Sequence, residues 1–204
     1  TNRAPMGVAI YKRPKDNAFF VIVSGKSGPE EGYLWQYKLE SDANGQISIT
    51  FVREFGKFSG KKEIEAIAVD NELGYVYYSD ETTGVRKYYA DPDVTDPGKE
   101  LALFATKGFA RDHEGISIYK QKNGKGYILV SDQQANRFWI FPREGTKRSP
   151  HDHPPVKIIE TETIESDGND VTSQPLPGFP AGLLVAMSNG KVFHYYDWRD
   201  IFEK

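Results

Sequence analysis

A pattern of β-strands recurs along the chain about every fifty residues, and this repeat constrains the possible folds more than any other feature. In its clearest copy, an alternating apolar run at 115–119 is followed by a turn at 122–125, a second run at 126–132 and a third at 137–141. The turn contains Asn-Gly, which predicts a β-hairpin when it lies between two such runs. This copy therefore predicts a three-stranded antiparallel meander.

Each copy has a small residue at the start of its first strand, and these residues lie 59, 49 and 53 positions apart: Gly7, Ala66, Gly115 and Gly168. A period near fifty is typical of the four-stranded blades of a β-propeller and not of a solenoid or a sandwich. We therefore expect an all-β fold, in which four-stranded antiparallel blades form one partial β-propeller domain over residues 1–204. The blade units are expected at about 7–53, 63–108, 109–163 and 164–204.

The first strands of these blades are expected to begin near Val8, Ile67, Ile116 and Val171. We expect a connection at 54–62, a surface loop at the proline-rich segment 148–155 and a short helical turn near 197–202. Propellers protect their strand edges by closing a ring of about 4–8 blades, whereas four units leave an open arc. We therefore expect further blades before Thr1, or a second copy of the chain, to cover the terminal sheets near Met6 and Ile201.

Charge and composition exclude several classes of protein. The formal net charge of −3 does not indicate a nucleic-acid or anionic-membrane partner. No apolar run approaches the roughly 20 residues of a membrane span. The absence of cysteine excludes disulfides and a catalytic thiol, and no Walker loop, Gly-x-Ser-x-Gly elbow or His-Glu-x-x-His motif occurs. Ordinary nucleophilic hydrolysis has no candidate residue here.

Acidic residues recur just before the first strand of three copies: Glu63, Glu65, Asp112, Glu114, Asp167 and Asp170. The innermost strand of each blade begins at the mouth of the central channel, so we expect equivalent positions on successive blades to converge there. Carboxylates in one small volume repel one another unless they are protonated or bridged by cations, and oxygen ligands favour Ca²⁺ over Zn²⁺ or copper. A shared calcium site is one interpretation, and solvated acids in turns that end strands are the other.

A Ser-Asp pair, or a variant of it, follows the middle strand of each copy: Ser24-Gly25-Lys26, Ser79-Asp80-Glu81, Ser131-Asp132 and Ser188-Asn189. Small polar residues at a strand end are ordinary turn formers. Lys26 is different, because an ammonium group at the same mouth could bind a phosphate or carboxylate. The alternative is an ion pair between Lys26 and Glu30 or Glu31 on a solvated loop.

The histidines leave two interpretations open. His113 lies among the acids and could donate a proton, but alternation along the strand would point it away from its neighbours. His151-Asp152-His153 has the composition of a metal-binding motif, yet it lies between prolines and is also compatible with an ordinary surface loop.

Several segments closely resemble the β-propeller phytases, in the same order and along the whole chain: 7–11, 23–26, 63–70, 112–119, 123–131, 167–168 and 179–186. That family consists of secreted, six-bladed, calcium-dependent propellers that hydrolyse phytate (myo-inositol hexakisphosphate). The resemblance implies that this chain is the C-terminal part of such a propeller. It also implies a phosphate ester as the small-molecule substrate and Ca²⁺ as the cofactor.

The resemblance further implies roles for individual residues. Lys26 resembles the lysine that binds a substrate phosphate, and Glu65, Glu114 and Asp167 resemble catalytic acids. The residues that resemble calcium ligands are Glu65, Asp80, Asp112, Glu114 and Asp167. Several positions depart from the family pattern: Met6, Ser27, Thr161, the pair Ser188-Asn189, and Asp80, which takes the place of a glutamate.

Two other functions remain open. A calcium-dependent lactonase or esterase propeller would need one deeply buried ion instead of a cluster. A non-catalytic binding propeller would use the acids only to brace the channel. In every case the sequence predicts a calcium-dependent or acid-braced β-propeller.

Overall fold

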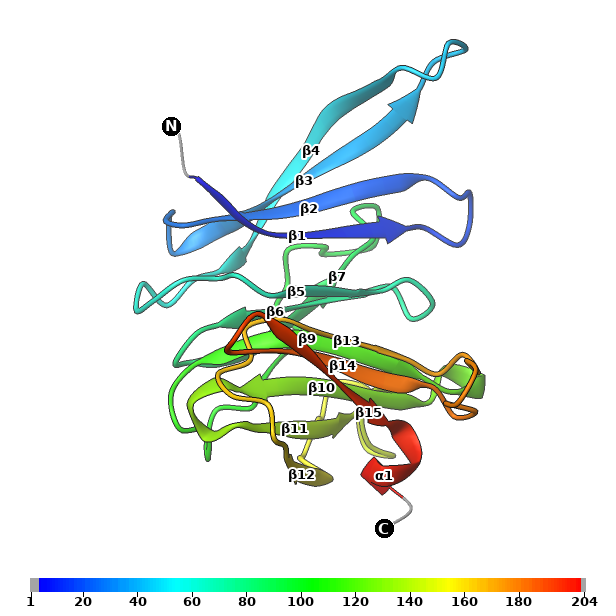
Figure 1. The fold of residues 1–204 in the computed structure, drawn as a ribbon. Helices are drawn as coiled ribbons and strands as arrows, with labels where there is room; N and C mark the ends of the chain where they lie inside the picture. The colour runs from blue at the N-terminus through cyan, green and yellow to red at the C-terminus, as the bar shows by residue number, and fades with distance from the viewer. Residues whose placement is uncertain (1–3, 203–204) are drawn as a thin grey trace. The chain divides into compact units, whose positions relative to one another are not determined.

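The computed structural model describes residues 4–202, and the chain divides into two compact units, Thr1–Leu103 and Phe104–Lys204 (Figure 1). Unit 1 is built from two four-stranded sheets, each in sequential strand order. The strands of the first sheet are β1 (Pro5–Lys12), β2 (Phe19–Gly25), β3 (Glu31–Ser41) and β4 (Ile47–Lys57). Those of the second are β5 (Ile67–Asp70), β6 (Tyr75–Asp80), β7 (Gly84–Tyr89) and β8 (Ala102–Phe104).

Unit 2 has one four-stranded and one three-stranded sheet. The first contains β9 (His113–Lys120), β10 (Gly126–Asp132), β11 (Arg137–Pro142) and β12 (Lys157–Glu160), with 3₁₀ turns at Lys122–Gly124 and Gln133–Ala135. The second contains β13 (Asn169–Thr172), β14 (Leu183–Ser188) and β15 (Val192–Asp197), followed by α1 (Trp198–Phe202). Neighbouring strands pair antiparallel in both units. The predicted all-β architecture of antiparallel blades is confirmed.

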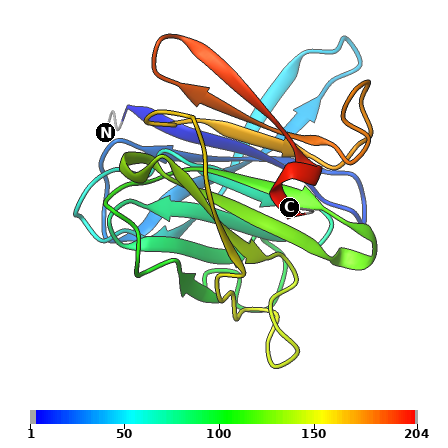
Figure 2. The same cartoon turned by 60° about the horizontal axis from the view of Figure 1, so that its bottom comes forward.

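The last sheet differs from the prediction, because it has three described strands and not four. After β15 the chain turns directly into α1 (Figure 2). The Trp198 ring stacks on Tyr119 with centroids 3.5 Å apart, and the Phe202 ring lies 4.5 Å from that of Tyr127. Burial of these aromatic rings against β9 and β10 stabilises the helical turn, by about 1.5–3 kcal/mol for each fully buried large side chain. The segment expected to be a short helical turn is therefore α1. Within residues 4–202, no helix is long and apolar enough to cross a membrane.

The connection predicted at 54–62 is also corrected, because β4 continues through Lys57. Phe55 pairs with Leu34 and is buried, so the apolar pattern extends past the expected strand end. The register of β3 and β4 shifts between Gln36 and Tyr37. Beyond this register shift, β3 and β4 continue to pair as a long hairpin.

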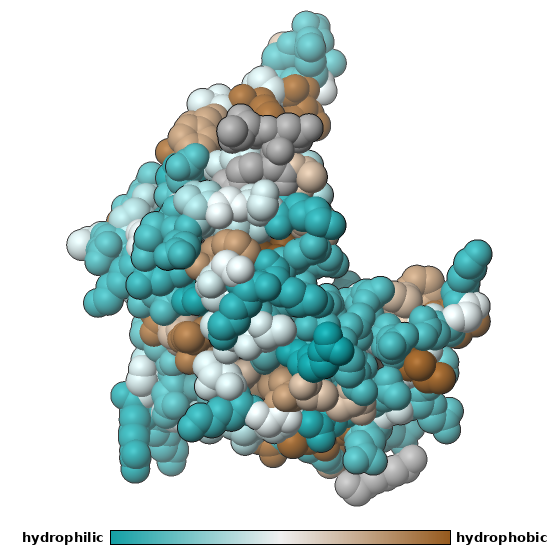
Figure 3. All heavy atoms as spheres, turned by 90° about the vertical axis from the view of Figure 1, so that its left-hand side faces the viewer, coloured by the Kyte–Doolittle hydropathy of each residue, from teal (hydrophilic) through white to brown (hydrophobic). Residues whose placement is uncertain are grey.

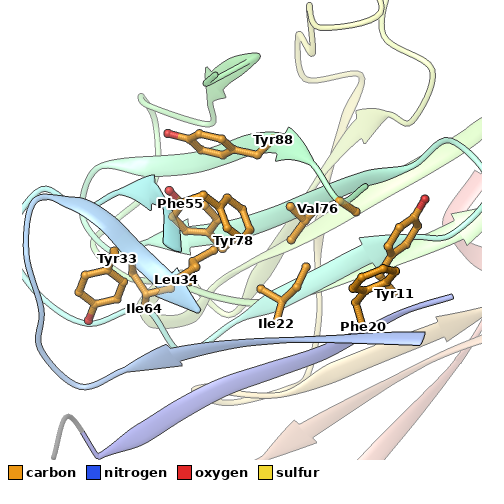
Figure 4. Packing of buried hydrophobic residues seen from close by; sticks show 11 residues of the cluster. Tyr11, Phe20, Ile22, Tyr33, Leu34, Phe55, Ile64, Val76, Tyr78 and Tyr88 are labelled. Carbon is orange, nitrogen blue, oxygen red and sulfur yellow. The ribbon is translucent and has the colours of Figure 1, made fainter. Parts of the chain in front are cut away.

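A cluster of buried apolar side chains between the two sheets forms the core of unit 1 (Figure 4). Alternate residues on each strand point into it, as expected for a strand with one face against a neighbouring sheet. Tyr78 and Tyr88 stack with centroids 5.8 Å apart, and Phe55 meets the Tyr88 ring edge-on. The cluster includes Tyr11, Phe20, Ile22, Leu34, Ile64 and Val76.

The opposite face of the first sheet is apolar but exposed. Val8 and Ile10 on β1 occupy the register positions that Ile67 and Val69 occupy on β5, and the latter two pack against the core. The exposed face continues along the β3–β4 hairpin through Phe51, and Figure 3 shows brown, apolar side chains just below the hydrophilic tip where this hairpin lies. An apolar sheet face of this kind is typical of an interaction surface. Its coverage by further blades or by a second copy stays a prediction.

One buried charge in unit 1 gives a testable stability prediction. The Lys87 side chain on β7 is fully buried, with its ammonium group 3.8 Å from the centroid of the Tyr75 ring. Burial lowers the pKa of Lys87 to about 7. Because an unfolded lysine titrates near pH 10, the unfolded state binds more protons between these values, and stability should rise with pH across that window.

We expect Lys87→Met to remove this rise and to stabilise the protein most at or below pH 7, where the native protein carries a buried ammonium group. Thermal melting at several pH values between about 6 and 9 tests this. Melting curves of the two proteins that shift in parallel with pH would contradict it.

Candidate functional site

The innermost strands of neighbouring sheets come very close at the repeated small residues. In unit 1, a Cβ atom on Gly7 would lie 2.1 Å from the carbonyl oxygen of Glu65. In unit 2, the Gly115 N–H donates to the Asp167 carbonyl oxygen at 2.9 Å, and a Cβ atom there would lie 3.0 Å from the same oxygen. A side chain would not fit at either glycine. The repeat of small residues therefore marks the place where each unit presents an acid, Glu65 or Asp167, beside the neighbouring sheet.

Serines at the ends of the middle strands hold this approach in place. The Ser24 hydroxyl accepts a hydrogen bond from Gly7 N–H at 2.8 Å and donates to the Ile64 carbonyl at 2.5 Å. In unit 2, the Ser131 hydroxyl donates to the Ser166 carbonyl at 2.9 Å. Each serine thus links its own sheet to the next, which is more than the turn formation expected of it.

Unit 1 brings Lys26 together with the acids that precede β5. Lys26 Nζ lies 3.2 Å from Glu63 Oε1, across the gap between β2 and the start of the next sheet. The alternative partners Glu30 and Glu31 form no ion pair with Lys26 among the described residues. A hydrogen bond with the Glu65 carboxyl group, and then the bond to the Lys26 ammonium group, lowers the pKa of Glu63. Lys26, Glu63 and Glu65 therefore form one polar cluster.

A second ion pair adjoins this cluster. The Lys62 ammonium group lies 2.9 Å from Glu81 Oε2, and the Glu81 backbone N–H donates to the Glu63 carbonyl oxygen at 3.3 Å. Glu81 is buried, with 2% of its surface exposed. Lys62 was not among the predicted site residues, and Glu81 was noted only within the strand-end segment Ser79-Asp80-Glu81.

Unit 2 links Asp112 and Asp167 through two glutamines of the turn after β10. Gln134 Nε2 donates to Asp112 Oδ2 at 2.7 Å and to Gln133 Oε1 at 2.6 Å. The side-chain amide of Gln133 in turn donates to the Asp167 carboxylate. Sequence reasoning missed both glutamines, although they directly follow the Ser-Asp pair that marks this end of the strand.

Asp112 and Glu114 are both buried, with 3% and 6% of their surfaces exposed. A carboxylate oxygen of Asp112 and one of Glu114 lie within 4.8 Å of each other. Burying two carboxylates is costly unless hydrogen bonds, protons or cations compensate their charge. Carboxylate and amide oxygens are the ligands that Ca²⁺ prefers, so Asp112, Glu114, Asp167 and Gln133 fit a calcium ion chemically.

The contacts of His113 involve residues other than these acids. Its Nε2 atom lies 2.6 Å from the Ala105 carbonyl oxygen, and its ring stacks on Phe109 with centroids 4.0 Å apart. This placement gives His113 a packing role and not that of a proton donor to the acid cluster.

Packing contacts also hold the loop that contains His151 and His153. The segment 148–155 has no helix or strand and is largely exposed, as expected of a surface loop, but His153 within it is buried. Its Nδ1 atom lies 2.7 Å from the Pro142 carbonyl oxygen, and its ring centroid lies 4.7 Å from that of Phe104. The Asp152 carboxylate accepts a hydrogen bond from the Thr146 hydroxyl at 3.0 Å. These contacts favour the ordinary-loop interpretation over the metal-binding one.

Asp80 has hydrogen-bond and ion-pair partners within unit 1, and the metal ligation expected of it stays a prediction. Its carboxylate accepts hydrogen bonds from the backbone N–H and hydroxyl of Ser59, at 2.9 and 2.6 Å, and from Nε and Nη2 of Arg86, both at 2.8 Å. Asp132 repeats the arrangement in unit 2, where it accepts from Ala110 N–H at 2.9 Å and from Arg137 Nε at 2.8 Å. The aspartate of the Ser-Asp pair is thus the partner of an arginine on the next strand.

The structure therefore groups the predicted site residues within each unit: Lys26 and Glu65 in unit 1, and Asp112, Glu114 and Asp167 in unit 2. The convergence of Glu65 with the acids of unit 2 on one channel mouth stays a prediction. The roles of these residues in binding calcium and substrate stay predictions as well.

Comparison with known proteins identifies relatives of this chain. Residues 3–194 match the model of the Phytase family. The 3-phytase of Bacillus subtilis (strain 168) is 30% identical over 191 residues, which are 91% of this chain and 47% of that relative. This chain thus spans about half the length of that curated protein. The β-propeller domain of Cps50 (Swd1) from Myceliophteria thermophila is 11% identical, with a TM-score of 0.51 over 95% of this chain and 53% of that one. This last likeness shows the fold alone.

Proposed function

Since this chain belongs to the phytase family, we propose that the protein is a calcium-dependent phosphomonoesterase that hydrolyses phytate. The observation that carries the proposal is the pair of buried carboxylates, Asp112 and Glu114, of which Asp112 is linked through two glutamines to Asp167. A phosphate ester as dense in negative charge as phytate would be repelled by such acids alone. Cations that bridge acids and phosphates resolve this conflict.

In the proposed mechanism, acids of each unit would hold Ca²⁺: Glu65 and Asp80 in unit 1, and Asp112, Glu114 and Asp167 in unit 2. Bound calcium would offset carboxylate charge, polarise phosphate oxygens and make a water molecule more acidic. Gln133 and Gln134 fix the orientation of Asp112 and Asp167 by their amide hydrogen bonds. Glu65, Glu114 and Asp167 are the acids proposed to orient the attacking water and to accept its proton.

Lys26 is proposed to bind a substrate phosphate. Its side chain is exposed and projects to the acids that precede β5, so an incoming phosphate can reach the ammonium group. Charge-assisted hydrogen bonds from an ammonium group to a phosphate are about twice as strong as neutral ones. The positive charge of Lys26 partly offsets the negative charge of the nearby acids, which alone would repel a phosphate.

We expect Lys26→Ala to lower kcat/KM for phosphate release at least about tenfold, which corresponds to about 1.4 kcal/mol of transition-state stabilisation. Calcium-dependent thermal stability should hardly change, because Lys26 is not a proposed calcium ligand. Steady-state kinetics and melting with and without calcium measure both effects. Unaltered kinetics, or lost stabilisation by calcium, would show that Lys26 has another role.

A further inference from the structure

The segment 108–112 of unit 2, which we call the strap, leads into β9 and ends with Asp112, one of the proposed calcium ligands. It contains no helix or strand. The backbone groups of such a segment must find partners outside regular secondary structure. The position of Asp112 therefore depends on the side chains that hold the strap.

The carboxylate of Asp132, at the end of β10, contacts the strap directly. One of its oxygens accepts a hydrogen bond from the Ala110 N–H at 2.9 Å. The other accepts from Arg137 Nε at 2.8 Å and from Trp139 Nε1 at 3.1 Å. Asp132 is fully buried, and the proposed mechanism gives it no role. Hydrogen bonds to an ionised acceptor are about twice as strong as neutral ones, so Asp132 holds the chain firmly two residues before Asp112.

The two side chains that donate to Asp132 also hold the strap. Arg137 Nη2 donates to the Gly108 carbonyl oxygen at 2.7 Å, and the Trp139 ring stacks on that of Phe109 with centroids 4.9 Å apart. A Cβ atom on Gly108 would lie 2.5 Å from the Trp139 ring. The strap therefore lies so close to β11 that a side chain would not fit at its first residue.

The turn after Asp132 holds the other end of the strap, at Asp112 itself. The Gln133 backbone N–H donates to the Asp112 carbonyl oxygen at 3.3 Å, and the Asp112 N–H donates to Gln134 Oε1 at 2.9 Å. Three consecutive residues, Asp132 to Gln134, thus contact the backbone of 110–112.

Unit 1 repeats this arrangement before its own acids. The Asp80 carboxylate accepts a hydrogen bond from the Ser59 N–H at 2.9 Å, and the Glu81 N–H donates to the Glu63 carbonyl oxygen at 3.3 Å. Asp80, like Asp132, forms an ion pair with an arginine of the next strand. In each unit, a strand-end aspartate thus holds the segment that leads to the acids of its own sheet.

We propose that Asp132 is a positioning residue, which sets the affinity of unit 2 for calcium by holding the strap so that Asp112 lies beside Glu114. Carboxylate oxygens of these two acids lie within 4.8 Å of each other. Two oxygens that share one Ca²⁺ can lie no farther apart than about twice the Ca–O bond of roughly 2.3–2.6 Å. A displaced strap would take Asp112 out of that range. The inference concerns the same acids as the proposed function and so rests on it.

Calorimetric titration of calcium into the protein, below the melting temperature of every variant, tests this without turnover. We expect Asp132→Asn to raise the Kd for calcium about tenfold or more, which is typical for loss of a residue that orients a metal ligand. In this variant the amide NH₂ group must face either the Ala110 N–H or Arg137 Nε, so two donors oppose each other in both orientations.

The matched control is Asp197→Asn. Asp197 also pairs with an arginine, with its Oδ2 atom 2.6 Å from Arg199 Nη2, but it lies at the end of β15 in the other sheet of unit 2. Both variants remove one negative charge from unit 2 and should melt at a lower temperature than the unchanged protein. Only Asp132→Asn should bind calcium more weakly, and the Kd of Asp197→Asn should stay within about twofold.

Gly108→Ala is a second variant, which tests the inference even if Asp132→Asn does not fold. It leaves every charge in place and displaces the strap through the contact of the new methyl group with Trp139, so we expect Kd to rise about threefold or more. If the folded variants of Asp132 and Gly108 bind calcium as tightly as the unchanged protein, the inference is overturned and the proposed function stands. If Kd follows the expected pattern but phytate is not hydrolysed, the inference stands and the proposed function fails.

Discussion

Replacing Glu114 by glutamine is expected to lower phosphate release from phytate by at least about 100-fold, because loss of a metal ligand should cost no less than loss of an outer-shell partner. Glu114 is buried beside Asp112 on the first strand of its sheet. The amide keeps the shape of the side chain but removes the negative charge that would hold a divalent cation. The same variant should also lose most of the rise in melting temperature that calcium produces.

The matched control is Asp170→Asn. This acid is exposed on the neighbouring strand β13, and its carboxylate accepts a hydrogen bond from the N–H of the next residue, Val171, at 2.8 Å. Like Glu114→Gln, this substitution removes one negative charge from unit 2, but it leaves Asp112 and Glu114 unchanged. Activity should therefore stay within about twofold. If Glu114→Gln retained both activity and stabilisation by calcium, the buried acids would not be the calcium site.

The second large effect is expected at Gly7, where replacement by alanine should destabilise unit 1 by about 2–3 kcal/mol. The added Cβ atom would lie 2.1 Å from the backbone oxygen of Glu65 and 3.0 Å from the Ile67 side chain. The backbone oxygen of Glu65 cannot rotate away from the new methyl group as a flexible side chain could. The strand β1 and the start of β5 must therefore separate. That movement would also stretch the hydrogen bonds that Ser24 makes to Gly7 and Ile64.

Gly168→Ala supplies the comparison for this prediction. Gly168 has the equivalent place in the repeat, but a Cβ atom there would have no neighbour within 4 Å. Urea unfolding of the two variants should therefore differ clearly, with Gly168→Ala close to the unchanged protein. Equal midpoints would mean that the recurring small residues are not required by the close approach of the inner strands.

The repeat of small residues and hairpins was sufficient to predict the antiparallel blades, because Asn-Gly turns and period-two patterns act locally. The deviations arise from contacts between distant segments. The chain after β15 forms α1 because Trp198 and Phe202 pack on Tyr119 and Tyr127. No local pattern near residue 198 indicates partners about seventy to eighty positions away.

The site shows the same division between local and distant signals. The positions of the acids at strand starts could be read from the sequence, and the neighbouring-sheet partner of Lys26 agrees with the expected direction of its side chain. The sequence could not reveal that Asp80 contacts Arg86 and Ser59, because the fold brings these partners to it. Likewise, the glutamine bridge from Asp112 to Asp167 joins two sheets of unit 2.

The most direct test of a calcium-dependent phytase is phosphate release from phytate by the full-length protein, first with calcium chelated and then after calcium is added back. We expect negligible release without calcium, recovery when calcium is added, and no recovery with magnesium at the same concentration, since Mg²⁺ keeps its water ligands and demands a stricter geometry. Release that is undiminished by chelation would contradict calcium dependence. Calcium binding without any release would leave only a binding propeller.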